Sequence, residues 1–194
     1  MPMLRKLLFL LLSLSLSFSL FPLHAQLHRH LKFMNLSMGL PVVDYVCALQ
    51  DQGLRVVASE PGAYRLHGEV AGIKGCHVIV LTDAPKTRVT RTSVVFPEAV
   101  AWADLERLYF QLKEALTQQY GEPTVSKERF KGVSHRADDR VRMAAVCQGK
   151  CRYHSDFVRK DGLVTLSIEG HPEGAFVFLL YVDALNDARA GAAP

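Results

Sequence analysis

The sequence contains none of the short motifs that mark the common enzyme classes. It has no glycine-rich phosphate loop, no Gly-x-Ser-x-Gly nucleophile elbow and no His-Glu-x-x-His zinc motif. A strong excess of charge is missing too, because the formal net charge is only +4. A balance this mild gives no reason to expect nucleic-acid binding. The sequence therefore assigns no catalytic residue and no cofactor.

Long apolar runs are absent except near the N-terminus. There Arg5 and Lys6 precede the uncharged run 7–21, and Ala25 follows shortly after, an order typical of a secretory signal peptide. We expect cleavage after Ala25 and export of the mature chain to the periplasm or the medium. A retained anchor is the alternative, but the run is short for a bilayer span of about 20 residues and contains four serines. No membrane span is expected in the mature chain.

Cysteines are few, and all four lie in the expected mature chain: Cys47, Cys76, Cys147 and Cys151. An exported compartment permits disulfides. If 148–150 forms a tight turn between two strands, Cys147 and Cys151 could bridge that hairpin, and Cys47 could bridge Cys76. Four cysteines allow three pairings, and buried free thiols are an equal alternative. Redox catalysis is poorly supported, since the three-residue spacer lies in a β-turn and does not open a helix.

The clearest secondary-structure signal is the stretch 102–123. Its apolar and aromatic residues recur at intervals of three and four, which predicts one buried face of an α-helix: Trp102, Leu105, Tyr109, Leu112 and Leu116. Gly121 and Pro123 are typical of a helix end. Such a stripe is far more often core than a ligand site, so we expect this helix to cover a sheet.

Segments with strand character lie on both sides of this helix. A shorter helix, 42–52, is predicted after Pro41, and it is followed by strands separated by short turns: 54–59, 63–70, 76–82 and 87–96. A second series follows the central helix, with segments at 124–131, 140–147, 151–160 and 175–183. Asp161-Gly162 predicts a two-residue hairpin turn in which Arg159 faces Val164 and Phe157 faces Leu166. That register puts one set of residues on a common face: Tyr153, Phe157, Val164, Leu166 and Ile168.

This order of elements predicts an α+β protein made of two tandem units, each a helix packed on an antiparallel β-meander. The units would be residues 26–97 and 98–186, after a signal peptide at 1–25 and before a flexible tail at 187–194. The repeat would be structural rather than literal. A single α+β sandwich with one long sheet is the alternative.

The weak candidates for a binding site lie in and beside the charged loop 132–139: Arg136, Asp138, Asp139 and Arg140. Acids flanked by arginines indicate a solvated charge cluster more than acid–base machinery. The eight histidines form no ligand cluster; His67 and His77 lie on neighbouring predicted strands, but a zinc site needs three or four converging ligands. We expect no metal site and assign no catalytic residue.

Several motifs resemble a group of uncharacterised exported proteins of Bacteroidetes. The resemblance is carried by Leu31-Lys32-Phe33-Met34, Leu66-His67-Gly68, Val94-Val95-Phe96-Pro97, the pattern from Trp102 to Pro123, Gly162-Leu163-Val164 and Tyr181-Val182-Asp183. The chain departs from that group at 35–41, where the group has a Gly-Ile-Pro turn. The resemblance implies tandem helix-plus-sheet units, similar to the fold of the β-lactamase inhibitor proteins, and no catalytic residue. By analogy it implies a protein or peptide partner bound on an open sheet face.

The leading hypothesis is therefore an exported, non-enzymatic module that binds a protein or peptide. One alternative is a small hydrolase whose site is assembled from residues distant in the sequence. Another is a carrier of a lipid or small ligand in a cavity between helices and sheet. A pocket that joins a histidine or cysteine to an acid would favour the enzyme, and an exposed apolar sheet face would favour the binding module.

Overall fold

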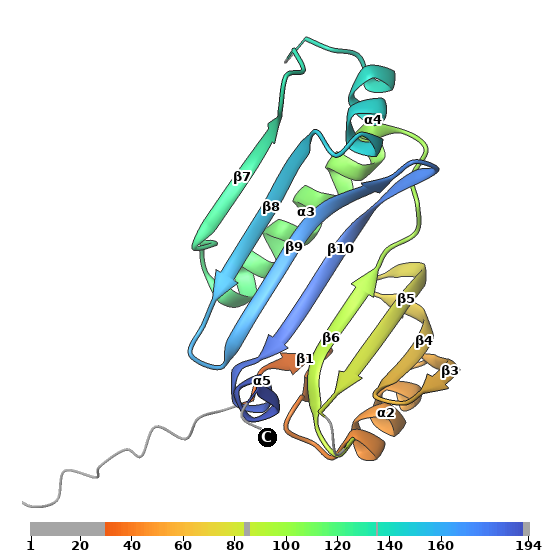
Figure 1. Ribbon diagram of the computed structural model, residues 1–194, viewed down its shortest axis with the longest axis vertical. Coiled ribbons are helices and arrows are strands. Elements are labelled where there is room, and N and C mark those ends of the chain that lie inside the picture. The colour runs from red at the N-terminus through yellow and green to blue at the C-terminus, as the bar shows by residue number, and fades with distance from the viewer. Residues whose placement is uncertain (1–29, 84–85, 135, 192–194) are drawn as a thin grey trace, which may run out of the picture.

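The computed structural model describes residues 30–83, 86–134 and 136–191, so the expected signal peptide and its cleavage site lie outside the described residues. The dominant element is one antiparallel sheet of eight strands in the order β3-β4-β5-β6-β10-β9-β8-β7 (Figure 1). Its strands are β3 (Arg55–Glu60), β4 (Ala63–Val70), β5 (Ile73–Thr82), β6 (Val89–Val95), β7 (Val125–Phe130), β8 (Cys151–Val158), β9 (Gly162–His171) and β10 (Gly174–Asp183). A separate hairpin is formed by β1 (Lys32–Phe33) and β2 (Leu36–Ser37).

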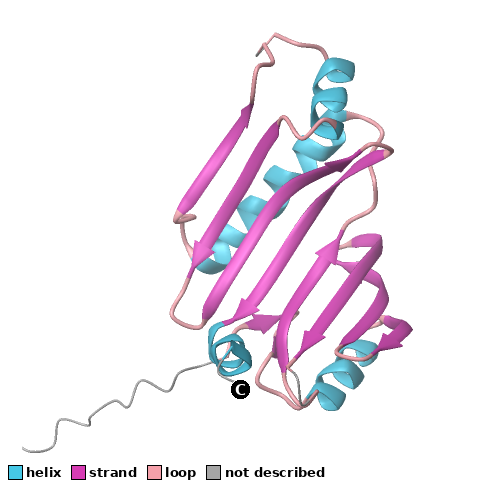
Figure 2. Ribbon diagram, viewed as in Figure 1, coloured by secondary structure: helices cyan, strands magenta, loops and turns pink. Residues whose placement is uncertain are grey.

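The helices within the described residues are α2 (Val42–Asp51), α3 (Trp102–Tyr120), α4 (Asp139–Cys147) and α5 (Ala184–Gly191). Tyr45 of α2 makes a hydrogen bond of 3.2 Å with Thr92 of β6, and Tyr109 of α3 makes one of 2.7 Å with Ser155 of β8. Thr92 and Ser155 project from the same face of the sheet, as the strand register requires. Both helices therefore cover one face, behind the strands in Figure 2. No helix in this part of the chain is long and apolar enough to cross a membrane.

Helix α3 forms as its periodicity predicts. The residues at intervals of three and four are all buried: Trp102, Leu105, Tyr109, Leu112 and Leu116. Gly121 ends the helix with a φ of 85°, a left-handed conformation that glycine adopts without strain. Burial of each large side chain contributes about 1.5–3 kcal/mol, so this stripe anchors the second half of the sheet.

The prediction of two tandem helix-plus-meander units is wrong. The protein is mostly β, and β6 pairs with β10 over five residues, from Val95 opposite Phe178 to Arg91 opposite Val182. This pairing joins all eight strands into one sheet. Sequence patterns could not reveal it, because β6 and β10 are separated by about 80 residues and their pairing is not local.

The segment predicted as a strand at 140–147 is helix α4 instead. The alternation of apolar residues at Val141, Met143 and Ala145 was misleading, because Ala145 and Val146 are the buried pair. The deciding signal is Asp138, whose Oδ1 accepts a hydrogen bond of 2.8 Å from the backbone N–H of Val141. This is an N-cap, and such caps favour a helix over a strand.

The hairpin between β8 and β9 differs from its predicted register. Phe157 faces Val164, not Leu166, and the N–H of Arg159 bonds to the carbonyl of Gly162 at 2.8 Å. The turn therefore lies at Lys160-Asp161, one residue earlier than expected. Side chains keep their faces because the pairing moves by an even number of residues. The predicted inward set is confirmed as buried: Tyr153, Phe157, Val164, Leu166 and Ile168.

Neither predicted disulfide is present, since all four cysteines are free. Cys147 ends α4 and Cys151 opens β8, so the two do not face each other across a hairpin. Cys47 is exposed on α2, whereas Cys76 is buried and its Sγ lies 3.1 Å from the carbonyl oxygen of Ile73. Burial raises the pKa of the Cys151 thiol to about 11 and also raises that of Cys76. At neutral pH both buried cysteines are therefore thiols rather than nucleophilic thiolates.

Candidate functional site

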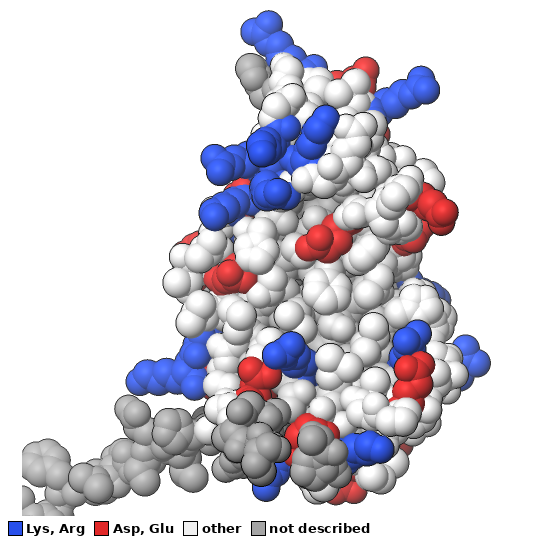
Figure 3. All heavy atoms as spheres, viewed as in Figure 1, with Lys and Arg blue, Asp and Glu red and all other residues white. Residues whose placement is uncertain are grey.

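Among the described residues, no helix lies over the centre of the sheet face opposite to α2 and α3; α5 lies at one end of it, where Asp187 pairs with Arg91 of β6 at 3.0 Å. Figure 3 shows this open face from the front, in the view of Figure 1. An eight-stranded sheet with one uncovered face normally alternates buried apolar and exposed polar residues. This sheet departs from that pattern at its centre.

An apolar band runs along β10 on the open face. Alternate residues of β10 point into the core, and the residues between them, which point to the open face, are also apolar: Phe176, Phe178, Leu180 and Val182. Each of these four is only partly buried. Val95 lies opposite Phe178, and Leu163 opposite Val182, so the apolar band extends onto β6 and β9. A contiguous apolar band on a sheet face whose centre no described helix covers is a candidate interaction surface.

A row of basic residues lies beside the apolar band, at the β7–β8 end of the same face. Three residues of the β7 segment face three residues of the β8 segment across the ladder: Lys127 with His154, Arg129 with Arg152, and Lys131 with Lys150. We call the five lysines and arginines among them the cationic ladder. Lysine and arginine side chains gather visibly over this end of the sheet in Figure 3.

The cationic ladder is not neutralised within the described residues. His154 is bound to Asp156 at 3.0 Å, but none of the lysines and arginines of the ladder forms an ion pair there. Glu169, on neighbouring β9, accepts a hydrogen bond from Ser167 instead. Like charges directly opposite each other destabilise a sheet, so two consecutive pairs cost free energy that the β7–β8 pair does not recover through ion pairs of its own.

On the covered face, one cluster resembles catalytic machinery. Lys113 Nζ lies 2.8 Å from Ser126 Oγ, a distance found in the serine–lysine pairs of some hydrolases. Glu128 changes this interpretation, because its Oε1 accepts hydrogen bonds of 2.7 Å from Lys113 and from Ser126. An ammonium group bound to a carboxylate keeps its proton and cannot serve as the base that activates Ser126.

The pKa values of this cluster agree with a structural role. Burial opposes ionisation of Glu128, but the hydrogen bonds from Lys113 and Ser126 outweigh it and hold the pKa of Glu128 below its ordinary value. Burial raises the pKa of Tyr109, whose hydroxyl lies 2.7 Å from Ser155 and donates to Glu128 at 3.2 Å. The cluster is therefore an ion pair with satisfied neighbours that fixes α3 to β7 and β8.

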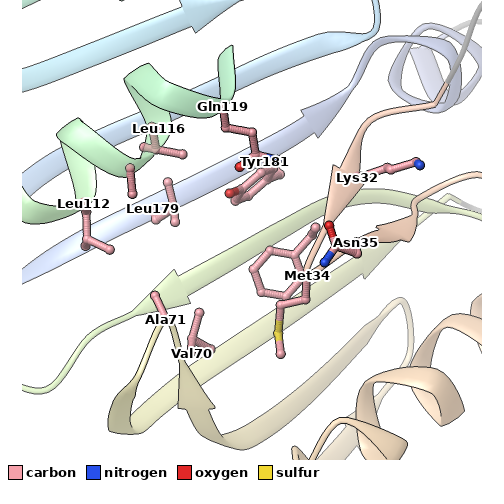
Figure 4. A pocket seen from close by; sticks show the side chains of 12 residues that line it. Lys32, Met34, Asn35, Val70, Ala71, Leu112, Leu116, Gln119, Leu179 and Tyr181 are labelled. Carbon is pink, nitrogen blue, oxygen red and sulfur yellow. The ribbon is translucent and has the colours of Figure 1, made fainter. Parts of the chain in front are cut away.

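A groove of about 260 Å³ lies on the covered side, between α3, the β1–β2 hairpin and the β4–β5 turn (Figure 4). Its surface is mostly apolar, with Leu112 and Leu116 from α3 and Leu179 and Tyr181 from β10. Lys32 is the one charged residue that lines it, and its side chain points away from the apolar floor. The groove is smaller than most ligand pockets and has few polar groups to orient a ligand.

The two acids among the predicted site residues, Asp138 and Asp139, have structural partners. Asp138 caps α4, and Asp139 accepts hydrogen bonds from the N–H groups of Ala103 at 2.8 Å and Trp102 at 3.1 Å, which caps α3. Arg136 donates its backbone N–H to Ser134 at 3.2 Å, and the side chain of Arg140 is exposed. The structure thus places the two acids at helix starts, where carboxylates are stabilised by the helix dipole.

Histidines come together at one point of the open face. His67 and His77 pair across β4 and β5, with ring centroids 5.0 Å apart. No group of three or more metal-ligating side chains occurs among the residues that the structure describes. Sequence analysis placed these histidines on neighbouring strands correctly, but it missed both the apolar band and the cationic ladder. The basic residues at 127–131 were visible, whereas their partners on β8 depend on a register that no local pattern specifies.

No protein-family model, curated protein or solved structure matches the chain. The resemblance to exported Bacteroidetes proteins therefore stays a prediction. Function has to be inferred from the two neighbouring features of the open face, the apolar band and the cationic ladder.

Proposed function

We propose that the protein is an exported, non-enzymatic module that binds a protein or peptide partner on the open face of its sheet. The observation that carries this proposal is the apolar band along β10, because an uncovered sheet face with phenylalanines at its centre is costly unless a partner covers it. Export is part of the proposal and rests on the basic, apolar and small residues of 1–25.

The charge beside the apolar band restricts the partner. An apolar contact surface bordered by lysine and arginine is complementary to a protein with an apolar patch next to acidic residues. Partly exposed aromatic residues such as Phe176 and Phe178 are typical of the centre of an interface, and charged residues are typical of its rim.

A crosslinking experiment tests the proposal. A photoreactive residue at position 178 should capture one recurrent partner from the periplasmic or secreted fraction, and the substitution Leu180→Asp should reduce that capture at least tenfold. Asp at the open face keeps the core intact but introduces a charge into the contact. Val43→Asp, at a site that is 62% exposed on α2 and so on the covered side of the sheet, is the matched control and should capture normally.

Two results would contradict the proposal. One is partner capture that Leu180→Asp does not reduce; the other is a protein that captures no partner but hydrolyses a substrate from a hydrolase panel. Small-ligand carriage is the second candidate function, and the groove of about 260 Å³ is the observation that favours it. It ranks second because the groove is small and Lys32, the one charged residue that lines it, points away from the apolar floor.

A further inference from the structure

We infer that the outer edge of β7 is the docking site for an extended acidic segment of the partner, which adds to the sheet as a further strand. The inference rests on the proposed function, since it names the chemistry and place of the contact. It depends on three observations: the free edge of β7, the cationic ladder on one side of it, and a cavity on the other side.

The first observation is the outer backbone edge of β7, which pairs with no other strand in the described part of the chain. The N–H of Lys131 bonds to the carbonyl of Lys150 at 2.8 Å, so odd-numbered residues of this segment direct their backbone groups toward β8. Ser126, Glu128 and Phe130 therefore direct their N–H and C=O groups outward, and β7 is the last strand of the sheet. Strand addition uses such a row of free groups.

The other edge of the sheet is less suited to strand addition. Strand β3 has an irregular register between Val56 and Ala58, whereas the β7–β8 pairing is regular over all six residues. Bulges bend an edge strand and interrupt its row of hydrogen-bonding groups, so they hinder pairing with a further strand. The β7 edge is therefore the better template.

The second observation is the charge of the open side. A strand laid beside β7 places its side chains about 4.5–5.5 Å from Lys127 and Arg129. These two residues are spaced two positions apart, about 6.8 Å along the strand, and Lys131 follows two positions later. Aspartate or glutamate at alternate positions of the incoming strand would match this spacing and relieve the repulsion between Arg129 and Arg152.

The third observation lies on the covered side of the same edge. A cavity of about 250 Å³ is lined there by both charged and apolar residues: Glu128, Arg129, Phe130, Val133, Ser134, Arg142 and Tyr153. Phe130 and Tyr153 project toward the covered face, so an apolar side chain of an added strand beside Phe130 would contact the aromatic part of this lining. The incoming segment should therefore alternate acidic and apolar residues.

Charged residues on an edge strand can also serve only to protect it, because they prevent two sheets from pairing edge to edge. The two roles make different predictions. If the lysines and arginine only guard the edge, an acidic strand gains nothing from them, and their removal releases self-association. If they dock a partner, an acidic strand binds and a basic strand of the same pattern does not.

The test uses the full mature chain and two blocked synthetic peptides, Thr-Glu-Val-Glu-Thr-Glu-Val and its counterpart with lysine at each glutamate. We expect the acidic peptide to bind at low salt and to slow hydrogen exchange at the amides of Ser126, Glu128 and Phe130. Lys127→Glu with Arg129→Glu should weaken binding about tenfold or more and should confer binding of the lysine peptide. Arg65→Glu, at the far end of the open face, is the matched charge control and should change neither affinity.

A backbone control separates strand addition from simple charge attraction. Ser126→Pro removes an outward N–H without removing a bond to β8, so it should abolish the exchange protection, whereas Ser126→Ala should retain it. Circular dichroism confirms that each variant is folded. The inference is wrong if the acidic peptide does not bind, if binding survives the double charge reversal, or if protection maps to other strands. If the peptide experiments fail while partner capture still depends on Leu180, the proposed function stands. Only the assignment of the docking site to the β7 edge is then wrong.

Discussion

Glu128 of β7 connects α3 to the sheet through its carboxylate. Its carboxylate accepts from Lys113, Ser126 and Tyr109, and the Lys113–Glu128 pair has side chains only 21% and 25% exposed. A pair this sheltered is screened less by solvent than a surface salt bridge, so it contributes more to stability. It also makes stability depend on pH, because the pKa of Glu128 lies below its ordinary value in the folded protein.

The substitution Glu128→Gln tests this contribution. A carboxylate with a depressed folded pKa stabilises the fold fully above the ordinary glutamate pKa of about 4.3, and this stabilisation is lost as pH falls through the folded value. We expect the variant to lose about 1–2 kcal/mol of unfolding free energy at pH 7. Urea unfolding between pH 7 and pH 3 should show that wild type and variant converge as the pH falls.

Glu114→Gln, on the exposed side of α3, is the control and should leave both the midpoint and its pH dependence unchanged. A Glu128→Gln variant that stays less stable by the same amount at pH 3 would show that packing, not charge, accounts for the loss. In that case the role assigned to the carboxylate would be wrong.

Among the elements, α3 and α4 are coupled through one side chain. The N-cap residue of α3 is Ala101, which has no side-chain oxygen, and Asp139 at the start of α4 supplies the missing acceptor to Trp102 and Ala103. Asp138 meanwhile caps α4 itself. The acidic pair thus serves two helix starts at once, and it explains why two consecutive aspartates occur there.

Removal of the shared cap should be measurable. We expect Asp139→Ala to lower the unfolding free energy by about 1 kcal/mol and Asp139→Asn to lower it less, because an amide oxygen still accepts. Hydrogen exchange at Trp102 and Ala103 should accelerate in the alanine variant. Arg140→Ala, which removes the exposed neighbour, should do neither; equal effects of Asp139→Ala and Arg140→Ala would contradict the capping role.

The elements show what the sequence could and could not predict. Helix α3 was predicted because five large residues repeat at helical spacing, and β4 was predicted with its observed bounds, 63–70, because turns at both ends delimit it. Helix α4 was missed because nine residues show too few turns for a helical period to outweigh an accidental alternation. The cationic ladder was missed because it depends on which residue of β8 faces Arg129, and that is fixed only when the strands pair.

At the scale of the whole molecule, the β6–β10 pairing makes one cooperative sheet from two sets of four strands. The only tryptophan, Trp102, is the first residue of α3 and packs against Phe130 and Tyr153 in the second half. Two independent units would unfold separately. One continuous sheet with a shared core should unfold in a single transition.

Val80→Ala tests this cooperativity. Val80 is fully buried on β5 in the first half, and its truncation should cost roughly 2 kcal/mol. We expect the urea midpoint reported by Trp102 fluorescence to fall by the full amount, although the tryptophan lies in the other half. Val57→Ala, at a side chain 55% exposed on β3, is the control and should leave the midpoint in place. An unchanged Trp102 midpoint in Val80→Ala would mean that the halves unfold independently.

The position of β10 has a consequence for how the chain is made. Strand β10 follows the other seven strands of the sheet in the sequence, yet it lies between β6 and β9. The strands β3–β6 can therefore join the strands β7–β9 only after residues 174–183 have left the ribosome. The order of the strands thus delays closure of the sheet until β10 has been synthesised.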